Sequence, residues 1–403
     1  MKQLSDTETA LIQSIDQQRM LDRTQSWAAT NSGTSNLPGL ADVAEALAEA
    51  FSSLPGEVTL REPAPVTVVD ANGSEVEKRH GNHLVCSVRP EAERRFLLTG
   101  HMDTVFPVDH PFQNQVWLDD DTLNGPGTAD MKAGIAIMLE ALTALETSDA
   151  APSIGYDVMI NSDEETGSLS SAALIDQLAR GKHAALTYEP SALPDGTLAH
   201  ARGGSGNYSV TFTGKSAHAG RNPLDGRNAI VAAADCAVRL KAMQHGDLPI
   251  NPAKIDGGAA NNVVPDHAVL RFNIRPKTTG AAEKFANDLK TLLHDIAAAH
   301  DVLTHCHGGI SRPPKPVNER AQKLFDLVRD TGAALGQTIG WQSTGGVCDG
   351  NNIAANHVPV VDTMGVRGGK IHSPDEFMIA SSLTERAQLS AIVLHRLATG
   401  EPL

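Results

Sequence analysis

Two side chains that can bind a metal stand at the end of an apolar run in the segment LLTGHMDTVFP. They are His101 and Asp103, and they follow a strand that we expect over residues 96–99. Because side chains alternate along a strand, both would lie on one face at its carboxyl end, where open α/β sheets place their sites. A surface turn of hydrogen-bonded polar residues has the same pattern, so this pair does not define a site by itself.

Four other segments repeat this form, in which an apolar run ends at residues of ligand type. Their residues are Asp130 in GPGTADMKAG, Glu164 and Glu165 in VMINSDEETGS, Glu189 in ALTYEP and His372 in GVRGGKIHSPDEF. Imidazoles combined with several carboxylates suit a pair of zinc-like ions without any thiolate. Two such ions lower the pKa of a shared water and polarise a carbonyl, which is the chemistry of hydrolysis. Asp130, between a Gly-Pro-Gly turn and an expected helix, is the candidate to bridge them.

Each of these segments also has a purely structural interpretation. Asp130 could simply cap a helix, and the acidic run at residues 163–165 could be a solvated turn. Three carboxylates at the end of an apolar strand would repel one another unless a cation is present or a pKa is raised. The combination of five such segments therefore favours a two-metal site.

Other histidines give weaker signals. His305 and His307 form a His-x-His pair in an apparent strand with no carboxylate nearby in the sequence, so we interpret them as structural. His218 follows a strand in the small-residue loop KSAHAGR, and on its own it indicates a surface residue.

The elements that must position these residues alternate between strands and helices, which predicts a mostly parallel sheet flanked by helices. After RGGSG, near residue 203, the order changes to a strand, a helix, two strands and a helix, and the proline cluster SRPPKP closes this part as a stiff linker. The first pattern then resumes. We therefore expect an α/β domain made of residues 1–203 and 315–403, interrupted by an inserted α+β domain at residues 204–314.

Composition narrows the class of protein. The net charge of −15 over 403 residues argues against a nucleic-acid partner. The sequence has no apolar run of about 18 residues, so no membrane span is expected. Its N-terminal segment is polar and predicts an amphipathic helix, not a signal peptide. Because the four cysteines are scattered without close pairing, we expect no disulfide framework and assign the protein to the cytoplasm.

In motif order and spacing, the five ligand-bearing segments resemble the M20 family of metallopeptidases and amidohydrolases, over nearly the whole chain. That family includes glutamate carboxypeptidases, acetylornithine deacetylases, succinyl-diaminopimelate desuccinylases and aminoacylases. The resemblance implies a di-zinc, aminopeptidase-like catalytic domain with a mixed, mostly parallel sheet. It also implies an inserted, ferredoxin-like α+β lid domain through which two chains dimerise. The expected cofactors are two Zn²⁺ ions, with Co²⁺ or Mn²⁺ as alternatives.

The resemblance also assigns roles around the metals. The implied ligands are His101 and Glu189 for one ion, Glu165 and His372 for the other, and Asp130 as the bridge. Glu164 matches the general base, which takes a proton from the attacking water and passes it to the leaving amine. Asp103 matches a carboxylate behind His101 that orients the imidazole. The peptide bond between Asp130 and Met131 would be cis.

A second group of residues matches positions that bind substrate. His218 corresponds to a lid histidine that reaches the partner subunit's site and stabilises the oxyanion. Asn262 and Arg275 correspond to lid residues that hold a substrate carboxylate, and Arg312 is a further helper. Gly346 lies in the segment GGVCDGNN, which matches a substrate-contacting loop.

These assignments predict hydrolysis of an amide bond in a small substrate that carries a carboxylate. Release of a C-terminal amino acid, as by a glutamate carboxypeptidase, is our first interpretation, and deacylation of an N-acyl amino acid is the alternative. Cys348 stands where relatives carry a small hydroxyl residue or glycine, which leaves the side-chain preference open. A non-catalytic metal-binding protein is a third possibility, but binding alone would not require Glu164.

Overall fold

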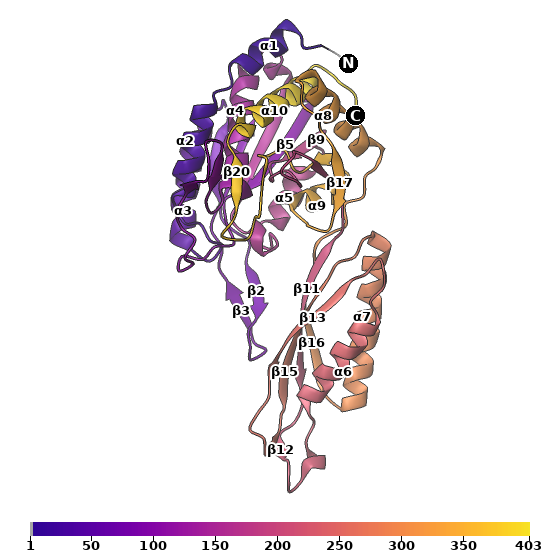
Figure 1. The fold of residues 1–403 in the computed structure, drawn as a ribbon. Coiled ribbons are helices and arrows are strands. Elements are labelled where there is room, and N and C mark those ends of the chain that lie inside the picture. The colour runs from indigo at the N-terminus through magenta and orange to yellow at the C-terminus, as the bar shows by residue number, and fades with distance from the viewer. Residues whose placement is uncertain (1–2) are drawn as a thin grey trace.

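The protein consists of two units joined end to end (Figure 1). The computed structural model describes residues 3–403. The larger unit contains both ends of the described chain. The smaller unit is built from the middle of the sequence and is joined to the larger one by β11 (Ser205–Thr213) and β16 (Leu303–Arg312).

The larger unit is organised around a six-stranded sheet. The strand order is β1 (Glu57–Arg61), β4 (His83–Val88), β8 (Ile154–Asn161), β5 (Arg94–His101), β9 (Ala184–Thr187) and β18 (Val360–Val361). The strands from β8 to β18 run parallel, whereas β1 and β4 join by antiparallel pairing. The prediction of a mixed, mostly parallel sheet is therefore confirmed.

Helices cover both faces of this sheet. Alternate residues of β5 show the two layers, because Leu98 belongs to one apolar cluster and Leu97 to another. The helices of the larger layer are α2 (Gln17–Ala28), α3 (Leu37–Phe51), α4 (Ala133–Glu146), α8 (Glu319–Ala334) and α10 (Ser382–Ala398), and α1 (Asp6–Gln13) packs on α10. The opposite layer contains α5 (Ala172–Ala179) and α9 (Asp349–Ala355). Helix α4 is buried along nearly its whole length, which fits its apolar sequence.

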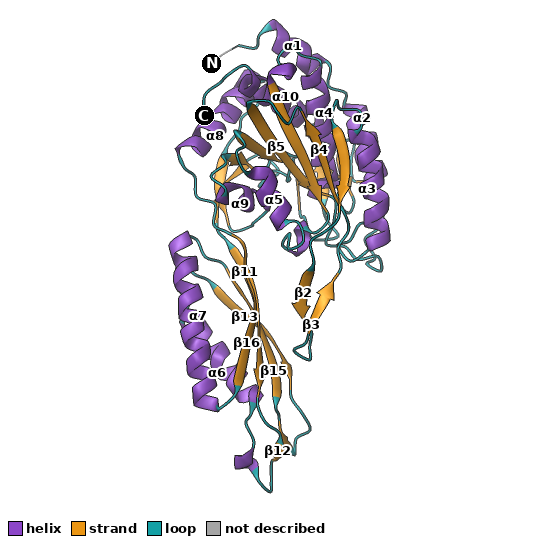
Figure 2. Cartoon of the chain, turned by 180° about the vertical axis from the view of Figure 1, so that it is seen from behind, coloured by secondary structure: helices purple, strands orange, loops and turns teal. Residues whose placement is uncertain are grey.

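Three small sheets complete the larger unit. They are β19 (Gly368–Gly369), β20 (Phe377–Ile379), β7 (Thr122–Asn124) and β6 (Val116–Trp117) in one sheet, β10 (Leu198–Arg202) with β17 (Trp341–Thr344) in the second, and β2 (Val66–Val69) with β3 (Glu75–Lys78) in the third. The last pair is a hairpin that projects from the larger unit and runs beside the strands of the smaller unit (Figure 2). We call it the β2–β3 hairpin.

The smaller unit is an antiparallel sheet with helices on one face. Its strand order is β13 (Ile250–Gly257), β15 (His267–Ile274), β11 and β16. Helices α6 (Ala229–Ala242) and α7 (Thr279–His300) cover one face and share an apolar core with the sheet. A short pair, β12 (Ala217–His218) and β14 (Val263–Val264), forms the tip farthest from the larger unit (Figure 1). All these elements lie within the residues that we expect to form the inserted domain.

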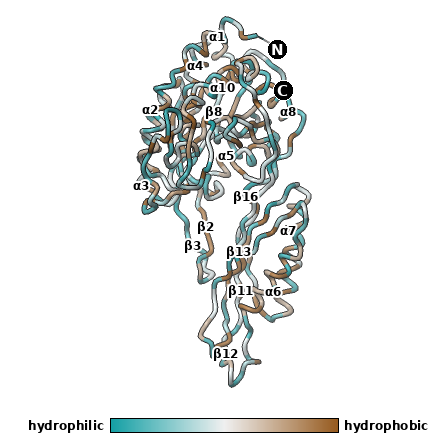
Figure 3. The backbone as a smooth tube through the Cα atoms, in the orientation of Figure 1, coloured by the Kyte–Doolittle hydropathy of each residue, from teal (hydrophilic) through white to brown (hydrophobic). Residues whose placement is uncertain are grey.

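Two local boundaries differ from the sequence-based expectation. Strand β5 continues to His101, so the histidine is part of the strand and not of the loop after it. Helix α4 begins at Ala133, and Asp130 and Met131 have non-helical backbone angles. Hydrophobic and hydrophilic residues are interspersed along the helices (Figure 3), and no helix among residues 3–403 is both long and apolar enough to cross a membrane.

Candidate metal centre and active site

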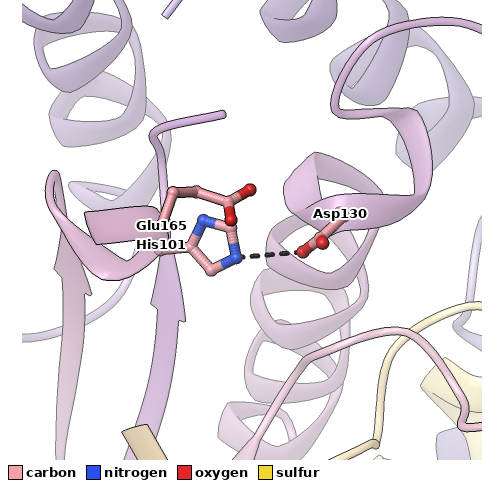
Figure 4. A group of neighbouring side chains, drawn as sticks. All are labelled: His101, Asp130 and Glu165. Carbon is pink, nitrogen blue, oxygen red and sulfur yellow. Dashed lines mark hydrogen bonds and ion pairs between the residues drawn. The ribbon is translucent and has the colours of Figure 1, made fainter. Parts of the chain in front are cut away.

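The five predicted metal ligands converge at the carboxyl ends of the parallel strands. His101 ends β5, Glu165 follows β8, and Glu189 follows β9. Asp130 lies in the turn before α4, and His372 lies in the loop between β19 and β20. Figure 4 shows the imidazole of His101 pointing toward Asp130, with Glu165 beside it.

Asp130 lies between the two histidines. Its Oδ1 is 3.0 Å from Nε2 of His101, and its Oδ2 is 3.2 Å from Nε2 of His372. Each histidine has a second carboxylate, since His101 Nε2 is 3.6 Å from Glu189 Oε2 and His372 Nε2 is 3.1 Å from Glu165 Oε2. Asp130 is thus shared by two histidine–carboxylate pairs, which is the arrangement of a bridging ligand.

The donor atoms also form compact groups that fit a metal ion. His101, Asp130 and Glu165 offer ligand atoms within 4.8 Å of one another, and so do His101, Glu164 and Glu189. Nitrogen and carboxylate oxygen donors are the ligands of zinc and similar divalent ions. The residues present therefore fit a metal centre.

The electrostatics agree with this chemistry. Burial, reinforced by the nearby Asp130 carboxylate, raises the pKa of Glu165 to about 7. Burial also raises the pKa values of Glu164 and Glu189, while hydrogen bonds to Asp130 and Glu165 raise the pKa of His372 to about 11. Several carboxylates are therefore held together away from water, where a bound cation would stabilise them.

Asp103 contacts both the His101 ring and the turn that contains Glu164 and Glu165. Its Oδ1 lies 3.4 Å from Nδ1 of His101, on the side of the ring away from Asp130. Its carboxylate also accepts hydrogen bonds from the backbone N–H groups of Glu164 and Glu165, at 3.2 and 3.3 Å, and from the Thr34 hydroxyl at 2.7 Å. Asp103 thus contacts both the histidine and the turn that carries the two glutamates.

Glu376 is a supporting residue that the sequence-based reasoning missed. Its Oε1 accepts hydrogen bonds from the backbone N–H groups of Ala129 and Asp130, at 3.0 and 3.1 Å. The side chain is buried, and burial raises its pKa to about 8. In the sequence, its position four residues after His372, in the segment HSPDEF, could have indicated that Glu376 lies near the site. The peptide bond between Asp130 and Met131, which this carboxylate adjoins, is cis as expected.

Glu164, the predicted base, is paired with Arg312. Glu164 Oε1 accepts a hydrogen bond from Arg312 Nη2 at 2.7 Å. The Arg312 side chain is buried, and it also donates to Asp349 at 2.5 Å and to the Ser168 hydroxyl at 2.7 Å. The structure therefore places Arg312 behind the base, with protein groups as its partners.

A cavity of about 790 Å³ opens next to the carboxylates, and we call it the metal cavity. Among the predicted substrate-binding residues, Arg275 and Gly346 line it together with Arg312. The Gly346 carbonyl accepts a hydrogen bond from Arg202, a buried residue that also pairs with Asp362. Arg202 thus holds the loop that carries Gly346, a contact that its sequence neighbours did not indicate.

Two predicted site residues lie elsewhere in this chain. His218 and Asn262 are exposed at the tip of the smaller unit, where the Ala219 N–H donates to the Asn262 carbonyl at 2.9 Å. This tip is the end of the smaller unit farthest from the larger unit (Figures 1 and 2), whose strand ends carry the metal ligands. Within one chain, the structure does not bring them to the other predicted site residues.

An α/β fold with imidazole and carboxylate donors gathered at its strand ends is typical of a metal-dependent enzyme. The sequence model of peptidase family M20/M25/M40 matches residues 97–396, and the chain belongs to this family.

Individual relatives agree with this assignment. The chain is 28% identical to carboxypeptidase G2 of Pseudomonas sp. (strain RS-16) over 377 residues, which cover 92% of this chain and 87% of the relative. It is 26% identical to a succinyl-diaminopimelate desuccinylase of Rhodospirillum centenum over 329 residues, covering 76% and 82%. A solved tripeptidase structure from Staphylococcus aureus is similar in fold, with a TM-score of 0.72, 25% identity, and coverage of 96% of this chain and 100% of that one.

Proposed function

We propose that this protein uses two zinc ions to hydrolyse an amide bond next to a free carboxylate, releasing a C-terminal amino acid. The observation that carries this proposal is the position of Asp130, whose two oxygens face different histidine–carboxylate pairs. The similarity to carboxypeptidase G2 favours this reaction.

In this proposal, each ion has two ligands of its own and shares Asp130. His101 and Glu189 would hold one ion, and Glu165 and His372 the other. Zinc is the metal that best fits these nitrogen and oxygen donors, and Co²⁺ or Mn²⁺ could replace it. When bound, the ions would polarise the scissile carbonyl and make the attacking water more acidic.

The residues of the chain would then move the proton and hold the substrate. Glu164, fixed by Arg312, would take a proton from the attacking water and deliver it to the leaving amine. Arg275, exposed on the metal cavity, would bind the substrate carboxylate through its guanidinium. Arg312 would act as a positioning residue, since it pairs with the base.

His218 and Asn262 would serve the site of a second copy. Both are exposed at the far tip of the smaller unit, so only another chain could bring them to a metal cavity. We therefore propose a homodimer formed through the inserted lid domain, residues 204–314, in which His218 stabilises the oxyanion of the partner's reaction. Asn262 would join Arg275 in holding the carboxylate.

Deacylation of an N-acyl amino acid is a second candidate, which the similarity to a desuccinylase favours. Both reactions cleave an amide near a carboxylate and would use the same residues.

The four free cysteines are consistent with a reducing compartment, and we propose the cytoplasm.

Metal analysis combined with a substrate panel tests the proposal. We expect two zinc ions per chain, and we expect hydrolysis of dipeptides or of N-acetyl, N-succinyl or N-formyl amino acids by the zinc-loaded protein. Treatment with a chelator should abolish the activity and added Zn²⁺ should restore it. A protein that binds two ions but cleaves no member of the panel would instead be a non-catalytic homologue.

A further inference from the structure

A second cavity lies between the β2–β3 hairpin and the face of the smaller unit's sheet that the helices leave open. Its volume is about 520 Å³, within the range of roughly 300–1,000 Å³ that is typical of small-molecule sites. We call it the hairpin pocket. Its lining includes Val66 and Val68 from the hairpin, Leu169 from the segment after β8, and Ser209 and Asn273 from the sheet.

The hairpin pocket adjoins the metal cavity. Thr166, Asn207 and Ser311 line both spaces. Thr166 directly follows the two site glutamates in the sequence, and Ser311 directly precedes Arg312. A molecule whose scissile bond lies at the carboxylate cluster can therefore extend past these residues into the hairpin pocket.

Direct contacts hold the outer wall of this pocket in place. Arg271 Nη2 donates to the carbonyls of Val69 and Asp70 in the hairpin, at 2.9 and 2.7 Å. His307 Nε2 lies 2.9 Å from the Thr67 carbonyl, and His305 Nε2 lies 2.9 Å from Glu75 Oε1. His305 and His307, which we expect to be structural, thus join the hairpin to the sheet, and the pocket is a built feature of the fold.

Most of the surface that lines the hairpin pocket is apolar, and Arg271, His307 and several hydroxyl and amide side chains make up the rest. Among the described residues that line it there is no aspartate, glutamate or lysine. Its Arg271 guanidinium is already paired with Asp256 and with the hairpin carbonyls. Leu169 remains 42% exposed there, an apolar side chain that a ligand could cover. The metal cavity differs, because the site carboxylates, Arg275 and Lys370 line it.

We infer that the hairpin pocket receives the acyl side of the substrate, and that this acyl group is uncharged and apolar. The inference rests on the proposed function, which places the scissile amide beside Asp130. Covering Leu169 and the partly exposed Val68 would favour longer acyl chains by about fourfold in affinity for each buried methylene. A succinyl group would bring a second carboxylate into a pocket whose guanidinium is already paired, so it should bind less well than a neutral group of equal length.

Equilibrium binding measures this preference without requiring turnover. The zinc-loaded Glu164→Gln protein would be titrated by calorimetry with N-acetyl-, N-butanoyl-, N-octanoyl- and N-succinyl-L-glutamate. We expect affinity to increase from acetyl to octanoyl, and N-succinyl to bind at least tenfold more weakly than N-butanoyl, which has the same number of acyl carbons. Equal affinity across the series, or tighter binding of N-succinyl than N-butanoyl, would overturn the inference.

Substitutions in the lining test whether the preference for longer acyl chains arises in the hairpin pocket. In the same Glu164→Gln background, Leu169→Gln makes the lining polar and Ser209→Trp fills the space, so each should lower the octanoyl-to-acetyl affinity ratio at least tenfold. Leu118→Gln is the matched control, because Leu118 is also exposed, at 61%, but lines neither cavity. An octanoyl-to-acetyl affinity ratio that is unchanged in both pocket variants would show that the acyl group binds elsewhere. If the wild-type protein binds these ligands with the expected preference but cleaves none of them, the proposed function fails and the pocket assignment stands.

Discussion

The buried guanidinium of Arg312 holds the carboxylate of Glu164 at 2.7 Å. The same guanidinium binds Asp349 at 2.5 Å, so Glu164 belongs to a buried network that extends from the metal cavity into the fold. Glu164 therefore has one orientation imposed on it, which suits a group that must receive and return a proton at a defined place.

Glu164→Gln should abolish most of the turnover while the metals stay bound. The amide keeps the length of the side chain and can still accept the hydrogen bond from Arg312, but it cannot take a proton. We expect kcat to fall by about 10²–10⁴-fold. Steady-state kinetics and metal content measured on the same sample check this, and a wild-type rate would exclude Glu164 as the base.

Arg312→Ala should destabilise the protein strongly, because it leaves Asp349 and Glu164 buried without their partner. We expect a loss of about 3–5 kcal/mol in the free energy of unfolding, measured by denaturant titration. The control is Arg180→Ala, which breaks an exposed pair with Asp176 and should change stability by less than about 1 kcal/mol. Similar losses in the two variants would contradict a structural role for the buried network.

Glu376→Ala should weaken metal binding although Glu376 is not a proposed ligand. Its carboxylate fixes the backbone that presents Asp130, so we expect affinity for zinc to fall about 10–100-fold. Glu376→Gln keeps an acceptor for the same N–H groups and should recover most of this loss. Competition with a chelator of known affinity distinguishes the variants. Equal zinc affinity in wild type and Glu376→Ala would refute the positioning role.

His218→Ala should lower kcat and leave zinc content and thermal unfolding unchanged, since the side chain is exposed at the tip. If lid domains cross between subunits, mixing this variant with Glu164→Gln should restore activity. Random exchange makes half of the dimers mixed, and each mixed dimer has one intact site, so about a quarter of wild-type activity should return. No recovery after confirmed subunit exchange would show that His218 does not act at the partner's site.

The sequence was sufficient to predict the class of fold and the residue types of the candidate site. Apolar runs that lead to His101, Glu165 and Glu189 are local patterns, and parallel strands bring their carboxyl ends to one edge whatever the rest of the chain does. The change of pattern near residue 203 likewise indicated a second unit. These inferences needed only alternation, composition and order along the chain.

Contacts between distant residues were decided by the tertiary structure alone. Packing between segments far apart in sequence decides which oxygen of Asp130 faces which histidine. It also decides that Glu164 pairs with Arg312. The same is true of the β2–β3 hairpin, whose hydrogen-bond partners in the smaller unit lie 196 to 240 residues away, from Ala71 with His267 to Thr67 with His307. No local pattern encodes such pairings, because they arise only when the folded chain brings the buried charges and the sheet faces together.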